Sequence, residues 1–423
     1  MNDTIFALSS GAPPAAIGVI RISGERAGSA LAALCGGLPP ARRPVVRRLS
    51  DGDGEPLDEA LVLWFPGTRT ATGEPLAELH CHGGRAVIAA VLKELETHED
   101  LREAEPGEFT RRAFANGRID LSQAEGLADL LSSETEWQRR QALVQAEGSL
   151  SRKVEDWRRR ILQAGAQVEA ILDFGDEDDV GDLPAQFSTD LALLCDEMIS
   201  LAGQPTAERL RDGVRVVFAG PPNAGKSSLF NALIEENASI VSVREGTTRD
   251  FIERPIALRG IPFVLVDTAG LRSQGADEIE AIGVERTMIQ MARADIVLWL
   301  GDPSDAPAGA LRIHSKADLL PASSEVDAVV SAVTGCGIGD LVEVLVRRAR
   351  LILPPPDTIS ANRRQSGLVR EAAGHLSDAR AIHDPLIVGE ALRSARVALD
   401  RLTGRQSTED MLDTLFGRFC IGK

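Results

Sequence analysis

The chain has 423 residues, a length that predicts roughly two to four domains, each large enough to bury a core. Lysine and arginine number 46 against 63 aspartates and glutamates, so the net charge of −17 excludes a surface that attracts nucleic acid everywhere. The five cysteines lie far apart without a C-x-x-C pair, which argues against a disulfide framework or a zinc ribbon.

The sequence carries no pattern of a membrane span or of a secretory signal. No apolar run approaches the ~20 residues that cross a bilayer, and Met1 to Ser10 lacks a basic segment followed by an apolar one. We therefore expect a cytoplasmic protein in a reducing compartment.

The first part of the chain predicts strands and the second predicts helices. Residues 1–117 mix short apolar runs, such as Ile17–Ile20 and Ala60–Phe65, with glycine and proline clusters, which is typical of a small α+β domain. From Ile119 to about Phe174 apolar residues recur three and four positions apart, and breakers are nearly absent. Long helices packed as a bundle are the expected result.

The remainder alternates and then returns to helices. From Val214 to about Arg350, short β-branched runs alternate with glycine loops, as in parallel α/β units, and Leu368–Leu402 has helical spacing again. The simplest topology is an α/β domain inserted into a helical domain. The predicted divisions are an α+β domain at 1–117, a helical domain in two halves at 118–210 and 351–423, and the inserted domain at 211–350.

A phosphate-binding loop opens the inserted domain. Gly220–Ser227 fits G-x-x-x-x-G-K-[ST] directly after the apolar run Val214–Ala219 and before a helical segment. In such a loop backbone N–H groups cradle phosphates, Lys226 reaches the β and γ phosphates, and Ser227 ligates Mg²⁺. The residues expected to contact nucleotide here are Gly220, Asn223, Ala224, Gly225, Lys226, Ser227 and Ser228.

Two further segments match the switches of a Ras-like P-loop GTPase domain. Within Gly246–Asp250, Thr248 is expected to place its hydroxyl on Mg²⁺. The apolar run Ile261–Val266 ends in Asp267 beside the metal, and a Gly270 N–H can meet the γ phosphate. The nucleotide contacts predicted from these segments are Thr247, Thr248, Asp267, Thr268, Ala269 and Gly270.

The base is predicted to be guanine rather than adenine. Ser315–Asp318 resembles the N-K-x-D segment of GTPases, in which Asp318 would accept hydrogen bonds from guanine N1 and N2. Lys316, the lysine of the same segment, is also expected to contact the nucleotide. In the Ser331–Gly335 loop, Ser331 precedes Ala332, whose N–H would meet O6. Ser315 replaces the usual asparagine, so one polar contact is weakened or differently made.

The connection before this loop is unusually short. Only Gly301–Ala310 separates the strand predicted at Ile296–Leu300 from the next one. A parallel crossover takes a dozen or more residues and usually a helix. We therefore expect this helix to be truncated or missing.

Hydrolysis needs a group other than the residue that follows the second switch motif. Leu271 is aliphatic and cannot orient water as the glutamine of Ras-like enzymes does. The carboxamide oxygen of Asn223 could hold a monovalent cation that supplies positive charge instead. Asn223 alone fits the role of a simple turn residue equally well.

Together these motifs resemble the bacterial tRNA-modification GTPase MnmE (TrmE) family over essentially the whole chain. The phosphate loop, the Gly-Thr-Thr-Arg-Asp segment, the inserted placement and the terminal Cys420–Lys423 all match the family's patterns. Further matches in the first part of the chain are Gly18–Gly24, His82–Gly84, Pro106–Thr110, Arg112–Phe114 and Asp120–Glu125.

The resemblance implies a GTPase that works with the FAD-dependent partner MnmG on certain tRNAs. The pair would install a 5-carboxymethylaminomethyl or aminomethyl group on the wobble uridine, with 5-formyl- or methylene-tetrahydrofolate as the one-carbon donor. The N-terminal domain would bind folate and form a homodimer, within a heterotetramer or larger complex with MnmG. The GTPase domains would approach each other when GTP, Mg²⁺ and K⁺ are bound.

The resemblance also implies roles for individual residues. K⁺ would be held by Asn223, Ser242, Arg244 and Thr247. Glu280 would orient the attacking water, and Cys420 is the family's functional cysteine, expected beside the folate site. Folate contacts would come from Arg21, Glu78, Arg118 and Lys423.

Two rival interpretations share part of this pattern. A ribosome-assembly GTPase would be a switch with the same GTPase motifs, but it needs neither a folate domain nor the terminal Cys-Ile-Gly-Lys. A folate-binding scaffold with a degenerate GTPase domain is suggested by Ser315 and the short connection.

Overall fold

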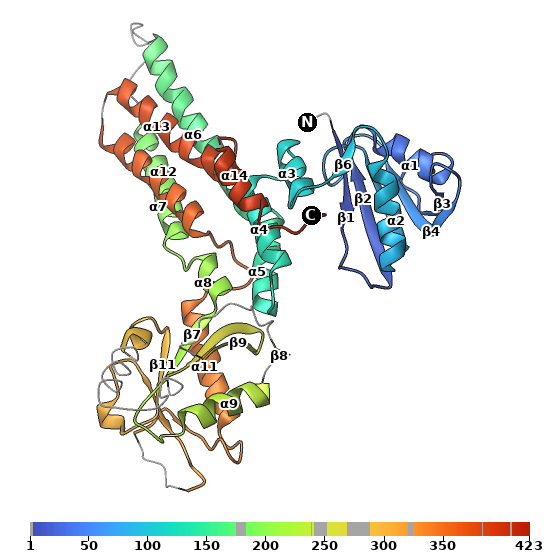
Figure 1. Ribbon diagram of the computed structural model, residues 1–423. Coiled ribbons are helices and arrows are strands. Elements are labelled where there is room, and N and C mark those ends of the chain that lie inside the picture. Colours follow the sequence, from blue (N-terminus) through green and yellow to red (C-terminus); the bar gives the residue numbers. More distant parts are fainter. Residues whose placement is uncertain are drawn as a thin grey trace. The chain divides into compact units, whose positions relative to one another are not determined.

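The computed structural model describes residues 3–174, 183–237, 239–240, 252–268, 288–319, 325–382, 384–406 and 408–423. The chain divides into two compact units, Met1–Ala128 with Thr403–Lys423, and Asp129–Leu402. Within the described ranges every helix is too short or too polar to cross a bilayer. The fold class predicted from the sequence is confirmed: a multidomain α/β and α chain, shown in Figure 1.

In the first unit, six strands among the described residues form one sheet in the order β3-β4-β5-β2-β1-β6. Only the β1–β6 pairing is parallel among the register pairs of this sheet. The strands are β1 (Thr4–Leu8), β2 (Ile17–Ser23), β3 (Val45–Ser50), β4 (Pro56–Phe65), β5 (Leu76–His82) and β6 (Leu101–Glu103).

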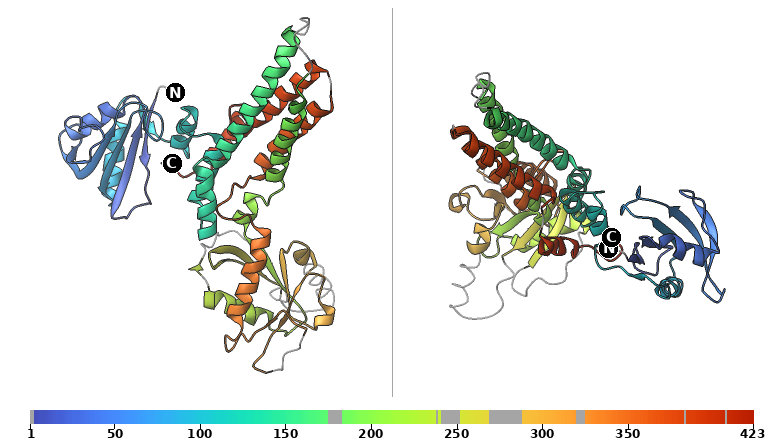
Figure 2. Two further views of the ribbon diagram at one scale, coloured as in Figure 1. Left: turned by 180° about the vertical axis from the view of Figure 1, so that it is seen from behind. Right: turned by 90° about the horizontal axis from the view of Figure 1, so that it is seen from above.

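Two helices cover one face of this sheet (Figure 2). Helix α1 (Ala27–Cys35) and helix α2 (Arg85–Glu96) pack against alternate strand residues, including Ile20, Ile22 and Leu79, which are fully buried. The alternation follows from the period of two in a strand, which turns every second side chain toward the helices. The other side chains of β2 and β5 therefore lie on the opposite face.

The C-terminal segment belongs to the same unit as this sheet. Helix α14 (Glu409–Phe416) contributes Leu412 and Phe416 to a small core with Leu121 of α4 (Leu121–Leu131). Helix α3 (Glu108–Ala115) connects the sheet to α4 in sequence. The chain's two ends are thereby joined in one unit.

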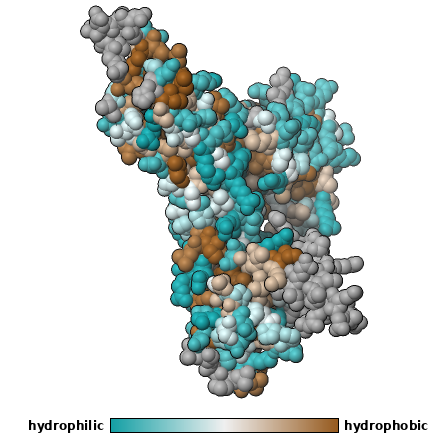
Figure 3. Space-filling view, turned by 90° about the vertical axis from the view of Figure 1, so that its left-hand side faces the viewer, coloured by the Kyte–Doolittle hydropathy of each residue, from teal (hydrophilic) through white to brown (hydrophobic). Residues whose placement is uncertain are grey.

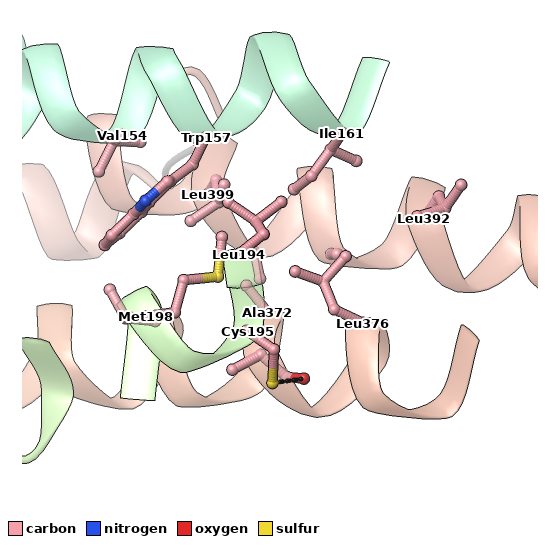
Figure 4. Close-up of a cluster of buried hydrophobic side chains, with 14 of the residues drawn as sticks. Val154, Trp157, Ile161, Leu194, Cys195, Met198, Ala372, Leu376, Leu392 and Leu399 are labelled. Atoms are coloured by element: carbon pink, nitrogen blue, oxygen red, sulfur yellow. Dashed lines mark hydrogen bonds between the residues drawn. The ribbon is translucent and has the colours of Figure 1, made fainter. Parts of the chain in front are cut away.

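In the second unit, a helical core forms from α6 (Ser149–Phe174), α7 (Ala185–Ala202), α12 (Arg363–Ala381) and α13 (Pro385–Thr403). Trp157, Met198, Leu376 and Leu399 are fully buried there, as Figure 4 shows. Figure 3 shows mostly hydrophilic side chains on one face of the molecule, with an apolar area at one end of the bundle.

Long helices were expected from Ile119 to about Phe174, and only the second half of this stretch forms one. Helices α4 and α5 (Glu136–Ala146) have 11 residues each, and only α6, with 26, is long. Thr135 begins α5 with a capping box, and Gly148, at φ +78°, separates α5 from α6. Capping and one left-handed glycine therefore outweigh the continuous apolar spacing.

Over the described stretches between 211 and 350, seven strands form a sheet in the order β13-β12-β11-β7-β10-β9-β8. The pairings from β10 through β7, β11 and β12 to β13 are parallel, and β9 is antiparallel to both β10 and β8. The elements are α8 (Ala207–Asp212), β7 (Val214–Ala219), α9 (Lys226–Asn237), β8 (Ser239–Ile240), β9 (Ile252–Leu258), β10 (Ile261–Asp267), β11 (Ile296–Trp299), β12 (Leu311–His314), β13 (Ala328–Val329) and α11 (Ile338–Ile352).

The prediction that the helix between β11 and β12 is truncated or missing is confirmed. The fully described connection from β11 to β12 contains a 3-10 turn, η2 (Pro303–Asp305), and no α-helix. Asp302 accepts a hydrogen bond from the Ser304 N–H and so begins this turn. The two strands still pair in parallel, with Leu298 opposite Leu311.

Candidate functional site

The phosphate loop lies between β7 and α9, as strand, loop and helix. Gly220 has φ +136°, and a Cβ built on it would lie 2.6 Å from the carbonyl oxygen of Leu300. Gly225, at φ +93°, precedes Lys226, the first residue of α9. Glycine is required at 220 because the end of β11 packs directly against the loop backbone.

Two polar side chains of α9 face the ends of neighbouring strands. The Lys226 Nζ, in a side chain only 8% exposed, donates to the carbonyl oxygens of Gly220 (3.0 Å) and Pro221 (2.7 Å). The Ser227 hydroxyl donates to the Asp267 carboxylate at 2.7 Å. Because β7 and β10 are parallel, their carboxyl ends meet at one edge of the sheet, which brings these groups together.

The pair of Ser227 and Asp267 fits a magnesium ion. A hydroxyl and a carboxylate oxygen are the hard ligands that Mg²⁺ prefers, and Ser227 in the first turn of α9 meets Asp267 at the end of β10 beside the phosphate loop. Thr268 has a different task in the structure, since its hydroxyl donates to the Phe218 carbonyl at 2.7 Å and holds the ends of β10 and β7 together.

The predicted base loops contact both each other and the phosphate loop. Ser315 Oγ donates to the Ala224 carbonyl at 2.6 Å, and Lys316 Nζ donates to the Asn223 carbonyl at 2.6 Å. Ser331 Oγ donates to Asp318 Oδ1, also at 2.6 Å. Ala332 follows Ser331 in the same turn.

Several predicted nucleotide residues lie outside the described residues. They are Ser242, Arg244, Thr247, Thr248, Ala269, Gly270 and Glu280. Of the predicted K⁺ ligands, Asn223 is described, exposed and in the left-handed region at φ +60°. Ser228 is exposed in the first turn of α9.

A second polar site lies on the sheet face opposite to α1 and α2. Arg21 of β2 stands directly across from Glu78 of β5, and its Nε donates to Glu78 Oε1 at 2.9 Å. His80 Nε2 lies 3.3 Å from the other oxygen of Glu78. Sequence reasoning did not include His80 in this site, although residues two apart on a strand share a face.

The terminal segment packs against the strand next to Arg21. Gly422, at φ +87°, lies so close to β1 that a Cβ on it would be 2.2 Å from the Leu8 carbonyl oxygen. The Cys420 carbonyl accepts hydrogen bonds from the N–H groups of Gly107 (3.4 Å) and Lys423 (3.2 Å). The Cys420 side chain itself is exposed.

Arg118 is placed by the loop that follows β4. Its Cγ lies 3.1 Å from the position of a Cβ on Gly73. The neighbouring Thr72 shares a 2.7 Å hydrogen bond with Ser23, which is two residues beyond Arg21. The four predicted folate residues thus lie in one unit, with Arg21 and Glu78 in direct contact.

A buried ionic cluster supports this loop. Arg112, only 1% exposed, donates to Asp3 Oδ1 (3.0 Å), Glu74 Oε2 (3.2 Å) and Glu108 Oε1 (3.0 Å). Burial alone raises the pKa of Glu108, but hydrogen bonds from Arg102 and Arg112 outweigh it and leave that pKa below its usual value. The cluster stays charged and fixes Glu74, which also accepts from Ser23.

Models of two domains match the chain in succession. The one described as the GTP-binding protein TrmE N-terminus matches residues 4–118. The one described as the MnmE helical domain matches residues 121–420.

Full-length relatives are also similar. The tRNA modification GTPase MnmE of Erythrobacter litoralis is 58% identical over 423 residues, which cover 100% of both chains. That of Novosphingobium aromaticivorans is 54% identical over 437 residues, again covering 100% of both chains. The chain described here therefore belongs to the family of the tRNA modification GTPase MnmE.

Proposed function

We propose that this protein hydrolyses GTP to drive a modification of the wobble uridine in certain tRNAs. With the FAD-dependent partner MnmG and a tetrahydrofolate one-carbon donor, it would install a 5-carboxymethylaminomethyl or aminomethyl group. The observation that carries this proposal is the phosphate loop, where Lys226, Ser227 and Asp267 converge in a chain that belongs to the MnmE family throughout. The family's name supports both GTP hydrolysis and a tRNA substrate.

Nucleotide binding would use groups that are already close together. The Lys226 ammonium has three N–H donors, and two of its acceptors are carbonyl oxygens of the phosphate loop. When nucleotide binds, the same ammonium could donate to phosphate oxygens instead, with only a small movement of the side chain. Ser227, Asp267 and Thr248 would hold Mg²⁺, which neutralises phosphate charge when bound. Asp318, Lys316, Ser331 and Ala332 would receive guanine.

Hydrolysis would depend on a monovalent cation and on the second switch. Asn223 supplies a carboxamide oxygen at the edge of the phosphate loop, and Ser242, Thr247 and the Arg244 carbonyl would complete a K⁺ site. The cation would stabilise the negative charge that develops on the phosphate oxygens during hydrolysis. Leu271 follows the second switch motif and has no polar group, so another residue must orient water, and the family resemblance assigns that role to Glu280.

Folate would bind in the first unit. The Arg21 guanidinium, Arg118 and Lys423 suit the carboxylates of a folate glutamate tail, and the Glu78 carboxylate suits the amino edge of a pterin. The 2.9 Å bond between Arg21 and Glu78 keeps both side chains oriented on one sheet face. Cys420 would lie beside the same site.

The proposed assembly follows the predicted division of the chain. Residues 1–117 would bind folate and form the homodimer, and the helical halves at 118–210 and 351–423 would relay the state of the inserted domain at 211–350. MnmG would join this dimer in a heterotetramer or larger complex.

Affinities of the purified chain for GTP, ATP and 5-formyltetrahydrofolate test the proposal, with Lys226→Ala as the matched control. We expect GTP and the folate to bind to the wild type, ATP to bind far more weakly, and Lys226→Ala to lose GTP but keep the folate. Binding of GTP without folate would favour a ribosome-assembly switch. Binding of folate without GTP would favour a scaffold with a degenerate GTPase domain.

A further inference from the structure

The loop that begins at Ser315 is fastened to the phosphate loop by two side chains. Ser315 Oγ donates to the Ala224 carbonyl and Lys316 Nζ donates to the Asn223 carbonyl, both at 2.6 Å. The two acceptors are consecutive residues of the phosphate loop. These contacts join segments that are 91 and 93 residues apart in the chain.

The backbone geometry brings the same two loops into contact. A Cβ on Gly225 would lie 3.6 Å from both Cβ and Oγ of Ser315 and 3.8 Å from Cε of Lys316. Asn223 and Lys316 both have φ +60°, a conformation that is uncommon for a lysine and that its contact with the phosphate loop helps to hold. The phosphate loop and the 315–318 loop therefore form one packed body.

The chemistry of a serine limits what it can do for the base. A hydroxyl has one proton, and in Ser315 that proton is given to Ala224. The N7 and O6 atoms of guanine are both acceptors, so the remaining lone pairs of Ser315 offer them nothing. An asparagine at this position would have two N–H donors and could serve both the loop and the base.

Recognition of guanine then depends on Asp318, at the other end of the 315–318 loop. Asp318 is held at Oδ1 by the hydroxyl of fully buried Ser331, 2.6 Å away. Its second oxygen can accept from guanine N1 and N2, and the N2 donor distinguishes guanine from bases that lack the 2-amino group.

We propose that Ser315 is a positioning residue that couples the base loop to the phosphate loop, and that guanine is recognised without a side-chain contact to N7. The inference rests on the proposed nucleotide site. Loss of the Ser315 hydroxyl would weaken phosphate binding equally for nucleotides with any base. Loss of the Ser331 hydroxyl would instead reduce the selectivity for guanine.

Dissociation rates of GTP, 7-deaza-GTP and ITP test this assignment by stopped-flow fluorescence. For the wild type we expect 7-deaza-GTP to match GTP within about twofold, because the Ser315 hydroxyl proton is given to Ala224, and ITP to leave about tenfold faster. Ser315→Ala should speed the release of all three by about the same factor, roughly fivefold, as expected for one lost neutral hydrogen bond. Ser315→Thr should restore slow release, and Ser331→Ala should shrink the difference between GTP and ITP.

Ser304→Ala removes a hydroxyl of η2 that, among the described residues, bonds to Asp302, so it serves as the control and should release all three nucleotides at the wild-type rate. The inference is overturned if the wild type discriminates strongly against 7-deaza-GTP and Ser315→Ala abolishes that discrimination. It is equally overturned if Ser315→Ala releases GTP as slowly as the wild type. A wild type that binds no guanine nucleotide would instead overturn the proposed function, and this inference with it.

Discussion

Replacing Gly422 by alanine probes the docking of the terminal segment on β1. The residue is buried with φ +87°, and the new Cβ would lie 2.2 Å from the Leu8 carbonyl oxygen and 2.8 Å from the Ser9 Cα. Both neighbours are backbone atoms of a strand and its end, so neither can rotate away. The terminal segment must therefore leave its place.

The magnitude has two separable parts. Gly54 has φ +86° with no atom within 4 Å of its Cβ position, so Gly54→Ala carries only the left-handed backbone penalty of about 1 kcal/mol. Gly422→Ala carries the same penalty and also displaces Lys423. Because one charged hydrogen bond contributes about 1.5–3 kcal/mol, we expect the affinity for 5-formyltetrahydrofolate to fall about 10- to 100-fold.

Titration calorimetry of both variants with 5-formyltetrahydrofolate and with GTP provides the assay. Only Gly422→Ala should lose folate affinity, and both variants should bind GTP as the wild type does, because the phosphate loop belongs to the other unit. Equal folate affinity in the two variants would refute the reasoning, since the segment would then contribute nothing to that site.

Three other predictions concern turnover, the phosphate loop and acid stability. GTP turnover should be about tenfold or more faster in K⁺ than in Na⁺, and Glu280→Ala should keep GTP affinity while slowing hydrolysis; equal rates in the two salts would exclude the cation. Gly220→Ala should abolish GTP binding and lower the free energy of unfolding by about 3 kcal/mol in urea, whereas Gly309→Ala, whose Cβ position is open, should keep GTP affinity. Hydrogen bonds from Lys153, then Arg160 and Trp157, lower the pKa of Glu197 to about 2 against burial, so its contribution is present above about pH 4.5 and is lost as pH falls toward 2. Because its side chain is 36% exposed, Glu197→Gln should lower unfolding free energy by only about 1 kcal/mol at pH 7 and by progressively less in acid; a constant difference would contradict the assignment.

The phosphate loop and the short connection from β11 to β12 could both be predicted from local sequence patterns. The strand, glycine loop and helix around Lys226 follow from an apolar run and a spaced motif, and the structure has β7 and α9 at those places. The length of Gly301–Ala310 was enough to predict a connection without an α-helix. Both inferences needed only residues close together in the chain.

Other features depend on partners far apart in sequence. The contact of Arg21 with Glu78 is set by the register of β2 and β5, across 57 residues, whereas His80 meets Glu78 as a neighbour two residues along β5. Helix α5 is kept separate from α4 partly by tertiary contacts, since the Trp137 N–H donates to the Gly260 carbonyl at 3.0 Å. Apolar spacing alone carries no information about such contacts.

The most direct test of the proposed function is the wobble uridine itself. Nucleosides of tRNA would be measured by mass spectrometry in a strain that lacks this gene, complemented either with the wild type or with Lys226→Ala. We predict that the wild type restores the 5-substituted uridine and that Lys226→Ala leaves it unmodified. Full modification in the strain without the gene, or full restoration by Lys226→Ala, would contradict a GTP-driven role in this modification.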